Sequence, residues 1–446
     1  MSREIHLTSG SITPQLLRLC FPLLCANVLQ QLYNIINSLV VTYYIGDNAF
    51  AALGVAESVM NLFIFAITGA CMGASVLIAR FFGEENYPRL RRQLYVSAAL
   101  IGGCTLTAVI LGQLFLPQLL GLIQTPEELM GDVSSYLRVI LVGMVFTFTY
   151  NYLASALRAL GDTRTALYFL LLSLGYNLVA AWLLVAVFQM GITGTALATA
   201  SAQLLSSALC FIYIRKKRPF LTIHREDMKM DGELIRLTSS YAAIAALQQS
   251  SLYLGKLLIQ GAVNGIGTAA ISAFTATNRV ENFVQAFGIS GTEAIAIFVA
   301  QNFGAKHYKR AVEGFLKGMA ISVGVGVFFS AGMGIFAIPI AGLFLSTEPQ
   351  ATELCISFLR LISWFYLLSF FGNSFVGWFR GCGRMSVTFW GTTMQITIRV
   401  IGTYLLVASM GLDAVALSTG IGWICIVIYQ FLLFFLQVKK LPQEAA

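Results

Sequence analysis

Residues 93–116 read QLYVSAALIGGCTLTAVILGQLFL and contain no Asp, Glu, Lys or Arg. This stretch is long enough to cross a bilayer as a helix, which takes about 20 apolar residues. The rest of the 446-residue chain is similar, since 57% of it is apolar and 11% is charged. Soluble domains carry about 25% charge, and disordered chains are polar. The composition therefore predicts an all-α polytopic membrane protein.

Eleven further apolar segments surround this one. Most of the 28 Lys and Arg residues fall in alternate connections, such as 215–218 and 306–310, and the opposite connections contain none. The positive-inside rule then predicts that both termini are cytoplasmic, in a multi-pass protein of the cytoplasmic (inner) membrane. The twelve predicted transmembrane helices are 16–45, 49–79, 93–116, 132–156, 165–187, 193–214, 234–260, 267–300, 311–338, 353–379, 386–407 and 414–436.

The second half of the chain repeats the first. Arg158 and Gly161 recur as Arg380 and Gly383, 222 residues later. A six-helix unit that is used twice enters the membrane from the same side each time. The repeat therefore predicts two six-helix lobes related by a pseudo-twofold axis along the membrane normal. The predicted organisation is an N-lobe at 1–214, a cytoplasmic linker at 215–233, and a C-lobe at 234–446 with a short tail.

Motifs of several other protein classes are missing from the sequence. It has no Walker A motif, no His-Glu-x-x-His motif and no Cys-x-x-Cys pair among its eight cysteines. The net charge of +8 reflects topology, so it does not indicate nucleic-acid binding. We expect no enzyme activity, no cofactor, no bound metal, no nucleic acid and no ATPase subunit.

Polar side chains inside the spans are the candidate functional residues, because they are costly there. Asn34 and Asn37 continue a stripe that begins at Asn27, at helical spacing. Such a stripe forms either amide contacts between helices or the wall of a hydrated cleft. Asn177 corresponds to Arg399 in the repeat, so both lobes place a polar group at this point.

Ionisable groups inside the spans are few. Glu57 and Glu281 are expected to lie roughly half-way through the hydrocarbon, and Arg399 near the same depth. A central Arg costs about 2.5–3.5 kcal/mol on insertion scales, so Arg399 should face a cleft or pair with Glu281. Lys256 lies nearer the outer boundary, where its side chain can snorkel to the membrane surface.

The order of the motifs resembles the multidrug and toxic compound extrusion (MATE) family, in the branch common in Gram-positive anaerobes. The resemblance implies an antiporter that exports amphipathic, often cationic, compounds in exchange for sodium ions or protons. It also implies a small-molecule substrate, a lipid bilayer as surroundings, and a monomer. The residues that carry it are Pro22, 30–34 (QQLYN), 51–54 (AALG), Gly83, 156–164 (ALRALGDTR), 194–199 (GTALAT), 278–282 (NRVEN) and 301–304 (QNFG).

Four positions depart from the family pattern. Where relatives carry acidic residues, the resemblance places Asn37, Ala181, Ser369 and Gln395 in this chain. An amide cannot bind and release a proton near neutral pH, and a sodium site without a carboxylate loses most of its attraction. The coupling ion and the charge of the substrate are therefore left open by the sequence.

Two other functions remain as alternatives, a flippase of lipid-linked saccharides from the same superfamily and a transport-inactive sensor or scaffold.

Two sets of site residues follow from the polar and charged groups in the spans and from the resemblance. The predicted cleft residues are Asn34, Asn37, Asn151 and Asn177 in the N-lobe, and Gln248, Asn373, Gln395 and Arg399 in the C-lobe. The candidates for ion coupling are Glu57, Glu281, Asn37, Asn177 and Thr199.

Overall fold

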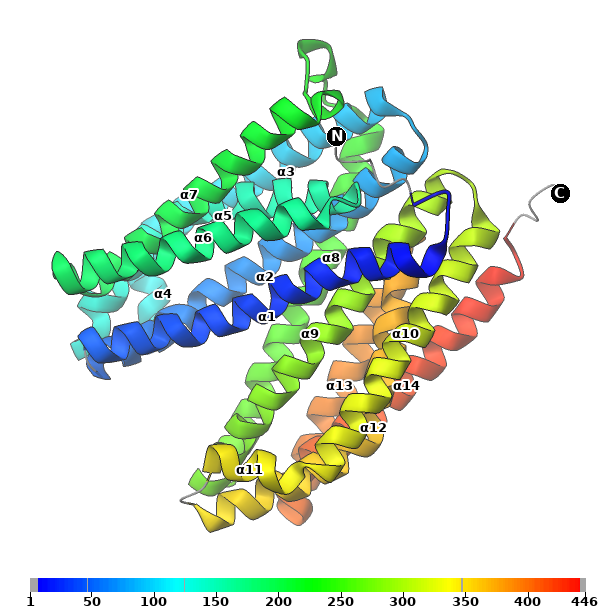
Figure 1. Ribbon diagram of the computed structural model, residues 1–446. Helices are drawn as coiled ribbons and strands as arrows, with labels where there is room; N and C mark the ends of the chain where they lie inside the picture. The colour runs from blue at the N-terminus through cyan, green and yellow to red at the C-terminus, as the bar shows by residue number, and fades with distance from the viewer. Residues whose placement is uncertain (1–6, 46, 124, 346–347, 442–446) are drawn as a thin grey trace. The chain divides into compact units, whose positions relative to one another are not determined.

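The computed structural model describes residues 7–45, 47–123, 125–345 and 348–441, without the side chains of 33–42 and 47–51. Within these residues the chain forms fourteen α-helices joined by short turns (Figure 1), which confirms the predicted all-α fold. The first seven are α1 (Ile12–Tyr44), α2 (Asp47–Gly83), α3 (Tyr87–Leu114), α4 (Leu116–Leu122), α5 (Glu127–Ala159), α6 (Thr163–Trp182) and α7 (Gly191–Lys217). The others are α8 (Gly232–Asn264), α9 (Thr268–Gly304), α10 (Tyr308–Ile335), α11 (Ala337–Leu345), α12 (Pro349–Gly381), α13 (Met385–Met410) and α14 (Asp413–Val438).

All twelve predicted spans correspond to long helices. Eleven of the described helices are long and apolar enough to cross a bilayer. The twelfth long helix is α8, whose apolar sequence is interrupted by the polar residues Gln248, Gln249 and Lys256. A single π-helical turn, Leu183–Val187, extends α6 to the predicted end of its span.

The internal repeat extends to helix lengths and to packing partners. The helices α2 and α9 each have 37 residues, α3 and α10 each have 28, and α5 and α12 each have 33. In the first half α5 packs against α2, α3 and α7, and in the second half α12 packs against α9, α10 and α14. Each half of the chain therefore folds by the same plan.

Two short helices, α4 and α11, were not predicted. They occupy equivalent places after α3 and α10, where Pro117 and Pro339 recur 222 residues apart. Proline is tolerated in the first turn of a helix but not in its interior. The proline therefore ends the long helix and starts a short one, where the sequence analysis expected a loop after 116 and a span continuing to 338.

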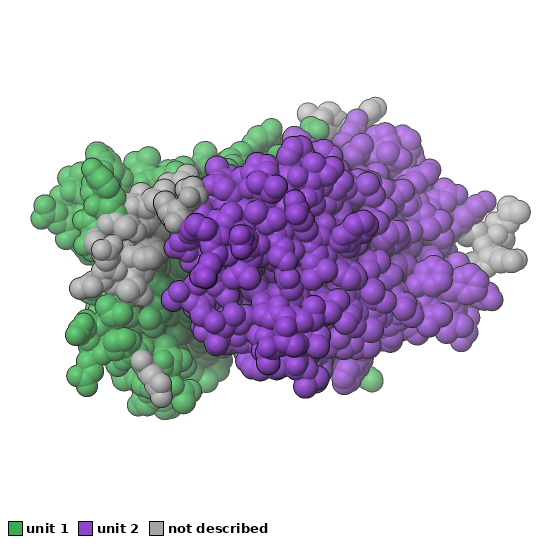
Figure 2. Space-filling model, turned by 90° about the horizontal axis from the view of Figure 1, so that it is seen from below, with its two compact units in different colours: residues 1–6, 25–246 green, residues 7–24, 247–446 purple. Residues whose placement is uncertain are grey.

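The described residues divide into two compact units (Figure 2). Unit 1 contains 25–246, and unit 2 contains 7–24 and 247–441. Both boundaries lie inside helices, in α1 and in α8, so each of these helices contributes to both units.

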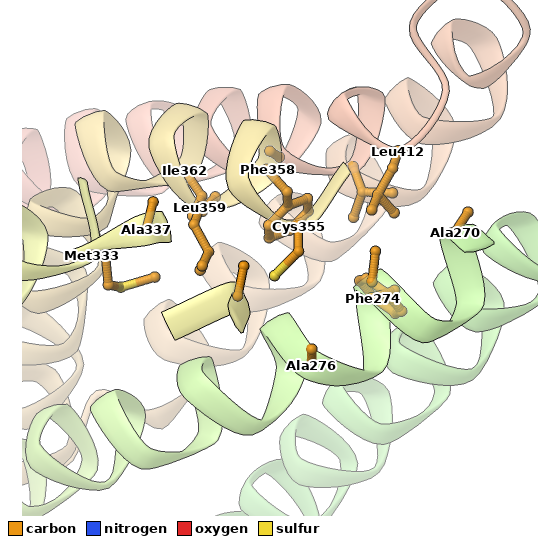
Figure 3. Packing of buried hydrophobic residues seen from close by; sticks show 14 of the residues in the cluster. Ala270, Phe274, Ala276, Met333, Ala337, Cys355, Phe358, Leu359, Ile362 and Leu412 are labelled. Carbon is orange, nitrogen blue, oxygen red and sulfur yellow. The ribbon is translucent and has the colours of Figure 1, made fainter. Parts of the chain in front are cut away.

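Close helix contacts at glycine and a continuous apolar cluster hold unit 2 together. A Cβ atom added at Gly377 of α12 would lie 2.8 Å from the Thr292 carbonyl oxygen of α9, so only glycine fits there. Elsewhere in unit 2, an apolar cluster joins α9, α11 and α12 to the turn before α14 (Figure 3). Its buried side chains include Phe274, Phe358 and Leu412.

The segment that leads into α8 is fixed to α3. Asp227 accepts a hydrogen bond of 2.8 Å from Arg91 Nε, and Glu233 accepts one of 2.6 Å from Arg89. The Phe220 ring stacks on Phe82. The predicted linker is thus an ordered part of unit 1.

The segment that leads into α1 is held in the corresponding way, by α10. Arg310 donates hydrogen bonds to the carbonyl oxygens of Leu7, Ser9 and Gly10 at 2.8–3.1 Å. It also donates to Gln15 Oε1 at 3.0 Å. One side chain therefore satisfies four acceptors, and Leu7 is fully buried.

Candidate functional site

The predicted polar stripe on α1 is only partly described. Asn34 and Asn37 belong to the helical backbone of α1, but their side chains lie outside the described residues. Gln30, which precedes them on the stripe, is exposed. The roles assigned to Asn34 and Asn37 stay predictions.

In unit 1 the structure brings Asn177 and Thr199 together. The Asn177 side chain on α6 is 2% exposed, and its Nδ2 donates to Thr199 Oγ1 on α7 at 3.2 Å. Ala181, one turn further along α6, is also buried, and α6 itself contains no Asp or Glu. This part of unit 1 therefore offers amide and hydroxyl oxygens, both neutral, to a ligand.

Glu57 on α2 is half-buried in a span of high hydropathy. Its carboxylate makes no ion pair or hydrogen bond with another side chain that the structure describes. Asn151 on α5, by contrast, donates from Nδ2 to the Thr147 carbonyl one turn earlier, at 2.8 Å. Glu57 is therefore a carboxylate inside a span of unit 1 that has no partner among the described side chains.

In unit 2 Gln248 is the centre of a buried hydrogen-bonded group. Its Nε2 donates to Thr392 Oγ1 on α13 at 2.7 Å, and its Oε1 accepts from the Arg380 guanidinium on α12 at 3.1 Å. Gln248 is 2% exposed, so in this structure it links three helices. Sequence reasoning assigned Arg380 to a loop and did not foresee this contact.

Three ionisable side chains inside the spans of unit 2 lie close enough to interact electrostatically. Glu281 lies within electrostatic range of Arg399 on α13 and of Lys256 on α8. Among the described residues Glu281 and Arg399 form no direct ion pair, and Arg399 Nε is buried without a hydrogen-bond partner. Glu281 and Arg399 therefore attract each other at longer range, without the direct ion pair that the sequence suggested. Tyr366 on α12 joins the group by donating to the Glu281 carbonyl at 3.2 Å.

A polar ladder continues along α9 and α12. Gln285 Nε2 donates to Ser369 Oγ at 3.1 Å, and Asn373 Nδ2 donates to Gln285 Oε1 at 3.3 Å. Thr292 donates to the Asn373 carbonyl at 2.9 Å. Ser369, at a family acidic position, is thus held by an amide. Sequence reasoning missed Gln285, although its position one turn after Glu281 was a usable signal.

Gln395 lies on the side of α13 that packs against α14. It is 8% exposed, and a Cβ atom added at Gly422 of α14 would meet the Gln395 carbonyl oxygen at 2.9 Å. The same helix carries Arg399 one turn later. No group of three or more metal-binding side chains occurs in the part of the chain that the structure describes.

Apolar helices of membrane-spanning length, repeated in the two halves of the chain, define a polytopic membrane protein. The chain belongs to the MatE family, whose model matches residues 22–183 and 228–405. This membership agrees with the resemblance found in the sequence.

Relatives of known description are similar over most of their length. "Probable multidrug resistance protein YoeA" of Bacillus subtilis is 28% identical over 360 residues, covering 79% of this chain and 77% of its own. "Probable multidrug resistance protein YpnP" of the same organism is 26% identical, covering 94% and 93%. "Multidrug export protein MepA" of Staphylococcus aureus is 22% identical, covering 81% and 80%.

Solved structures support the fold. A multidrug resistance MATE family transporter in an outward-facing conformation superposes with a TM-score of 0.92, at 22% identity and over 99% of both chains. A MATE structure in the bent conformation gives 0.93, at 22% identity over 99% of this chain and 98% of its own. The predicted architecture of two six-helix halves is that of these proteins.

Proposed function

We propose that the protein is a secondary active exporter of amphipathic toxic compounds, driven by a sodium or proton gradient. It would lie in the cytoplasmic membrane with both termini cytoplasmic, and it would act as a monomer without a cofactor or an ATPase subunit. The observation that carries this proposal is the repeated six-helix unit, with ionisable groups inside the spans of each copy. Two similar units are what alternating access requires, and the MatE membership supports the same function.

We assign ion coupling to Glu57 in preference to Glu281. A carboxylate that exchanges sodium ions or protons must have no fixed cation that competes for it. Glu281 has both Arg399 and Lys256 in electrostatic range, whereas Glu57 has no ionic partner among the described side chains. Asn177 and Thr199, also in unit 1, would supply neutral oxygens to a sodium ion.

The test is an export assay with the purified protein in proteoliposomes. Ethidium and a panel of neutral and anionic fluorescent amphiphiles would be loaded, and sodium and proton gradients would be imposed separately. We expect one gradient to accelerate the export of at least one compound, and an ionophore that dissipates that gradient to abolish the acceleration. Export at equal rates with and without every gradient would refute the coupling. No export of any probe would leave the sensor or scaffold as the better explanation.

The flippase alternative has one observation in its favour. Lys256 and Arg399 place two cations against one carboxylate in unit 2, as recognition of a lipid phosphate requires. Gradient-independent movement of a fluorescent polyprenyl phosphate across the proteoliposome membrane, without movement of the drug-like probes, would establish the flippase instead.

A further inference from the structure

The charges in the spanning part of unit 2 do not balance around Glu281. Lys256 and Arg399 both lie in electrostatic range of this single carboxylate. Three other charged groups in unit 2 have different neighbours. Arg279 lies over the Phe344 ring, 6.0 Å from its centroid, and Glu293 interacts with Arg380. The group of Lys256, Glu281 and Arg399 therefore carries a net charge of about +1, because two of its members are cations and one is an anion.

Close packing of α8 against α13 fixes this arrangement. A Cβ atom added at Gly255 would lie 2.6 Å from Ile396 Cγ2, so the two helices touch one residue before Lys256. One turn later Tyr404 of α13 donates to the Leu258 carbonyl of α8 at 3.1 Å. Lys256 is thus held beside the turn of α13 that carries Arg399.

The two cations differ in what surrounds them. Both lie in electrostatic range of Glu281, and Arg399 is the more deeply placed of the two. Lys256 is exposed, and its Nζ has one hydrogen-bond partner among the described residues, the neutral Asn282 Oδ1 at 3.4 Å. One carboxylate balances one of the two cations, so among the described residues this group has one positive charge without a counter-ion, and Lys256 is its accessible cation. A charge inside a membrane is costly unless it is paired.

We propose that Lys256 and Asn282 bind the anionic head of an amphipathic substrate. The oxygen of a carboxylate, sulfonate or phosphate would accept a hydrogen bond from Lys256 Nζ and a second one from Asn282 Nδ2. Arg399 adds positive potential to this site, and the net charge matches a ligand with one negative charge. The inference rests on the proposed export function, and it names the class of substrate.

The test compares two probes with the same apolar body and opposite heads, pyrenebutyrate and pyrenebutyl-trimethylammonium. Binding to the full-length protein in phosphatidylcholine nanodiscs would be measured by energy transfer from tryptophan to pyrene, after subtraction of empty nanodiscs. We expect Lys256→Gln to weaken binding of the anion about tenfold or more and to change binding of the cation less than about twofold. Lys256→Arg keeps the charge and should retain most of the affinity for the anion.

Arg360→Gln is the matched control, because it removes an exposed cation from α12, a helix that contributes no residue to the proposed site. Equal losses in Lys256→Gln and Arg360→Gln, or no loss in Lys256→Gln, would overturn the inference. The second source of anions is the bilayer itself. If phosphatidylglycerol nanodiscs abolish pyrenebutyrate binding, and Lys256→Gln loses its enrichment of bound phosphatidylglycerol, the occupant is a lipid headgroup and the inference is wrong.

The outcomes separate this inference from the proposed function. Gradient-driven export of the cationic probe, unchanged in Lys256→Gln and without binding of the anion, would refute the inference and leave the export function in place. Lys256-dependent binding of the anion without export of either probe would refute the export function.

Discussion

Arg89 and Arg310 occupy corresponding positions in α3 and α10, 221 residues apart. Arg89 binds the start of α8, and Arg310 binds the segment that leads into α1. Arg310 donates to backbone carbonyls between Leu7 and Gly10, while Arg89 pairs with the carboxylate of Glu233. The equivalent contacts therefore use different acceptors. Arg310 makes four hydrogen bonds, one of them to the carbonyl of the buried Leu7, whereas the Arg89 pair is exposed, with 67% of the Glu233 side chain accessible.

Arg310→Gln should therefore destabilise the protein more than Arg89→Gln does. Hydrogen bonds to a charged group contribute about 1.5–3 kcal/mol each, so the loss of several should cost about 2 kcal/mol or more. An exposed ion pair contributes at most about 1 kcal/mol. The measurement is the melting temperature of the purified protein in detergent, together with trypsin cleavage near Arg18. Equal melting temperatures for the two variants would contradict this reading of the Arg310 contacts.

The contact between Asp227 and α3 should depend on pH. Burial alone would raise the pKa of the Asp227 carboxyl, but the hydrogen bond from the His224 N–H and the Arg91 guanidinium outweigh it and hold the pKa below its ordinary value. A lowered pKa stabilises the fold above the unfolded-state value of about 3.9, and this contribution is lost as the pH falls through the folded-state pKa.

Asp227→Asn should accordingly lower the melting temperature near pH 7 and have a smaller effect near pH 3. Wild type and variant would be melted side by side across this range. Asp231→Asn, which alters a nearby carboxylate that caps the start of α8, is the control. A difference between wild type and Asp227→Asn that stays constant with pH would show that the carboxylate charge does not contribute.

Glu57→Gln should abolish the dependence of export on the driving gradient. The amide has the same size but neither binds a proton near neutral pH nor attracts a sodium ion strongly. Glu57→Asp keeps the charge and should retain part of the coupling. The assay is gradient-driven export in proteoliposomes, with gradient-free equilibration as the measure of intact protein. Full coupling in Glu57→Gln would transfer the role to Glu281.

Gly377→Ala should destabilise unit 2, because the added methyl group meets the Thr292 carbonyl at 2.8 Å and Ile295 at 3.0 Å. Overpacking of this kind costs about 1–3 kcal/mol. Gly324→Ala on α10 is the matched control, since no atom lies within 4 Å of its Cβ position. Alanine is a better helix former than glycine, so the control should be neutral or stabilising, by up to about 1 kcal/mol. Thermal melting would report both, and a stabilising Gly377→Ala would contradict the close packing.

The helices of this fold were predictable because apolar length and charge breaks determine them directly. The repeat was also readable, since Arg158 and Arg380 keep their spacing from neighbouring motifs. The short helices α4 and α11 were not predicted, because apolar length alone does not show that a proline starts a new helix close to the end of a long one. The role of Arg310 could not be read either, since its acceptors lie about 300 residues earlier in the chain.

The site was predictable in its membership more than in its partners. Glu281 and Arg399 stood out because charges are rare in the spans, and the structure places them within electrostatic range. Gln248 stood out as polar, but its bonds to Arg380 and Thr392 depend on three helices meeting. The sequence predicted only that Lys256 snorkels near a helix end. Its role as a candidate anion ligand depends on the nearby charges of Arg399 and Glu281. Pairings of this kind depend on the tertiary fold, which spacing along the chain does not encode.

The boundaries inside α1 and α8 have a consequence for the order in which the protein is made. Unit 2 includes residues 7–24, but Arg310, which binds residues 7–15, is synthesised about 300 residues later. Unit 1 in turn needs the start of α8, so it is incomplete until residue 246 has been added. Residues 7–24 therefore cannot complete their contacts in unit 2 until Arg310 has been added. Neither unit can finish folding from one half of the sequence alone.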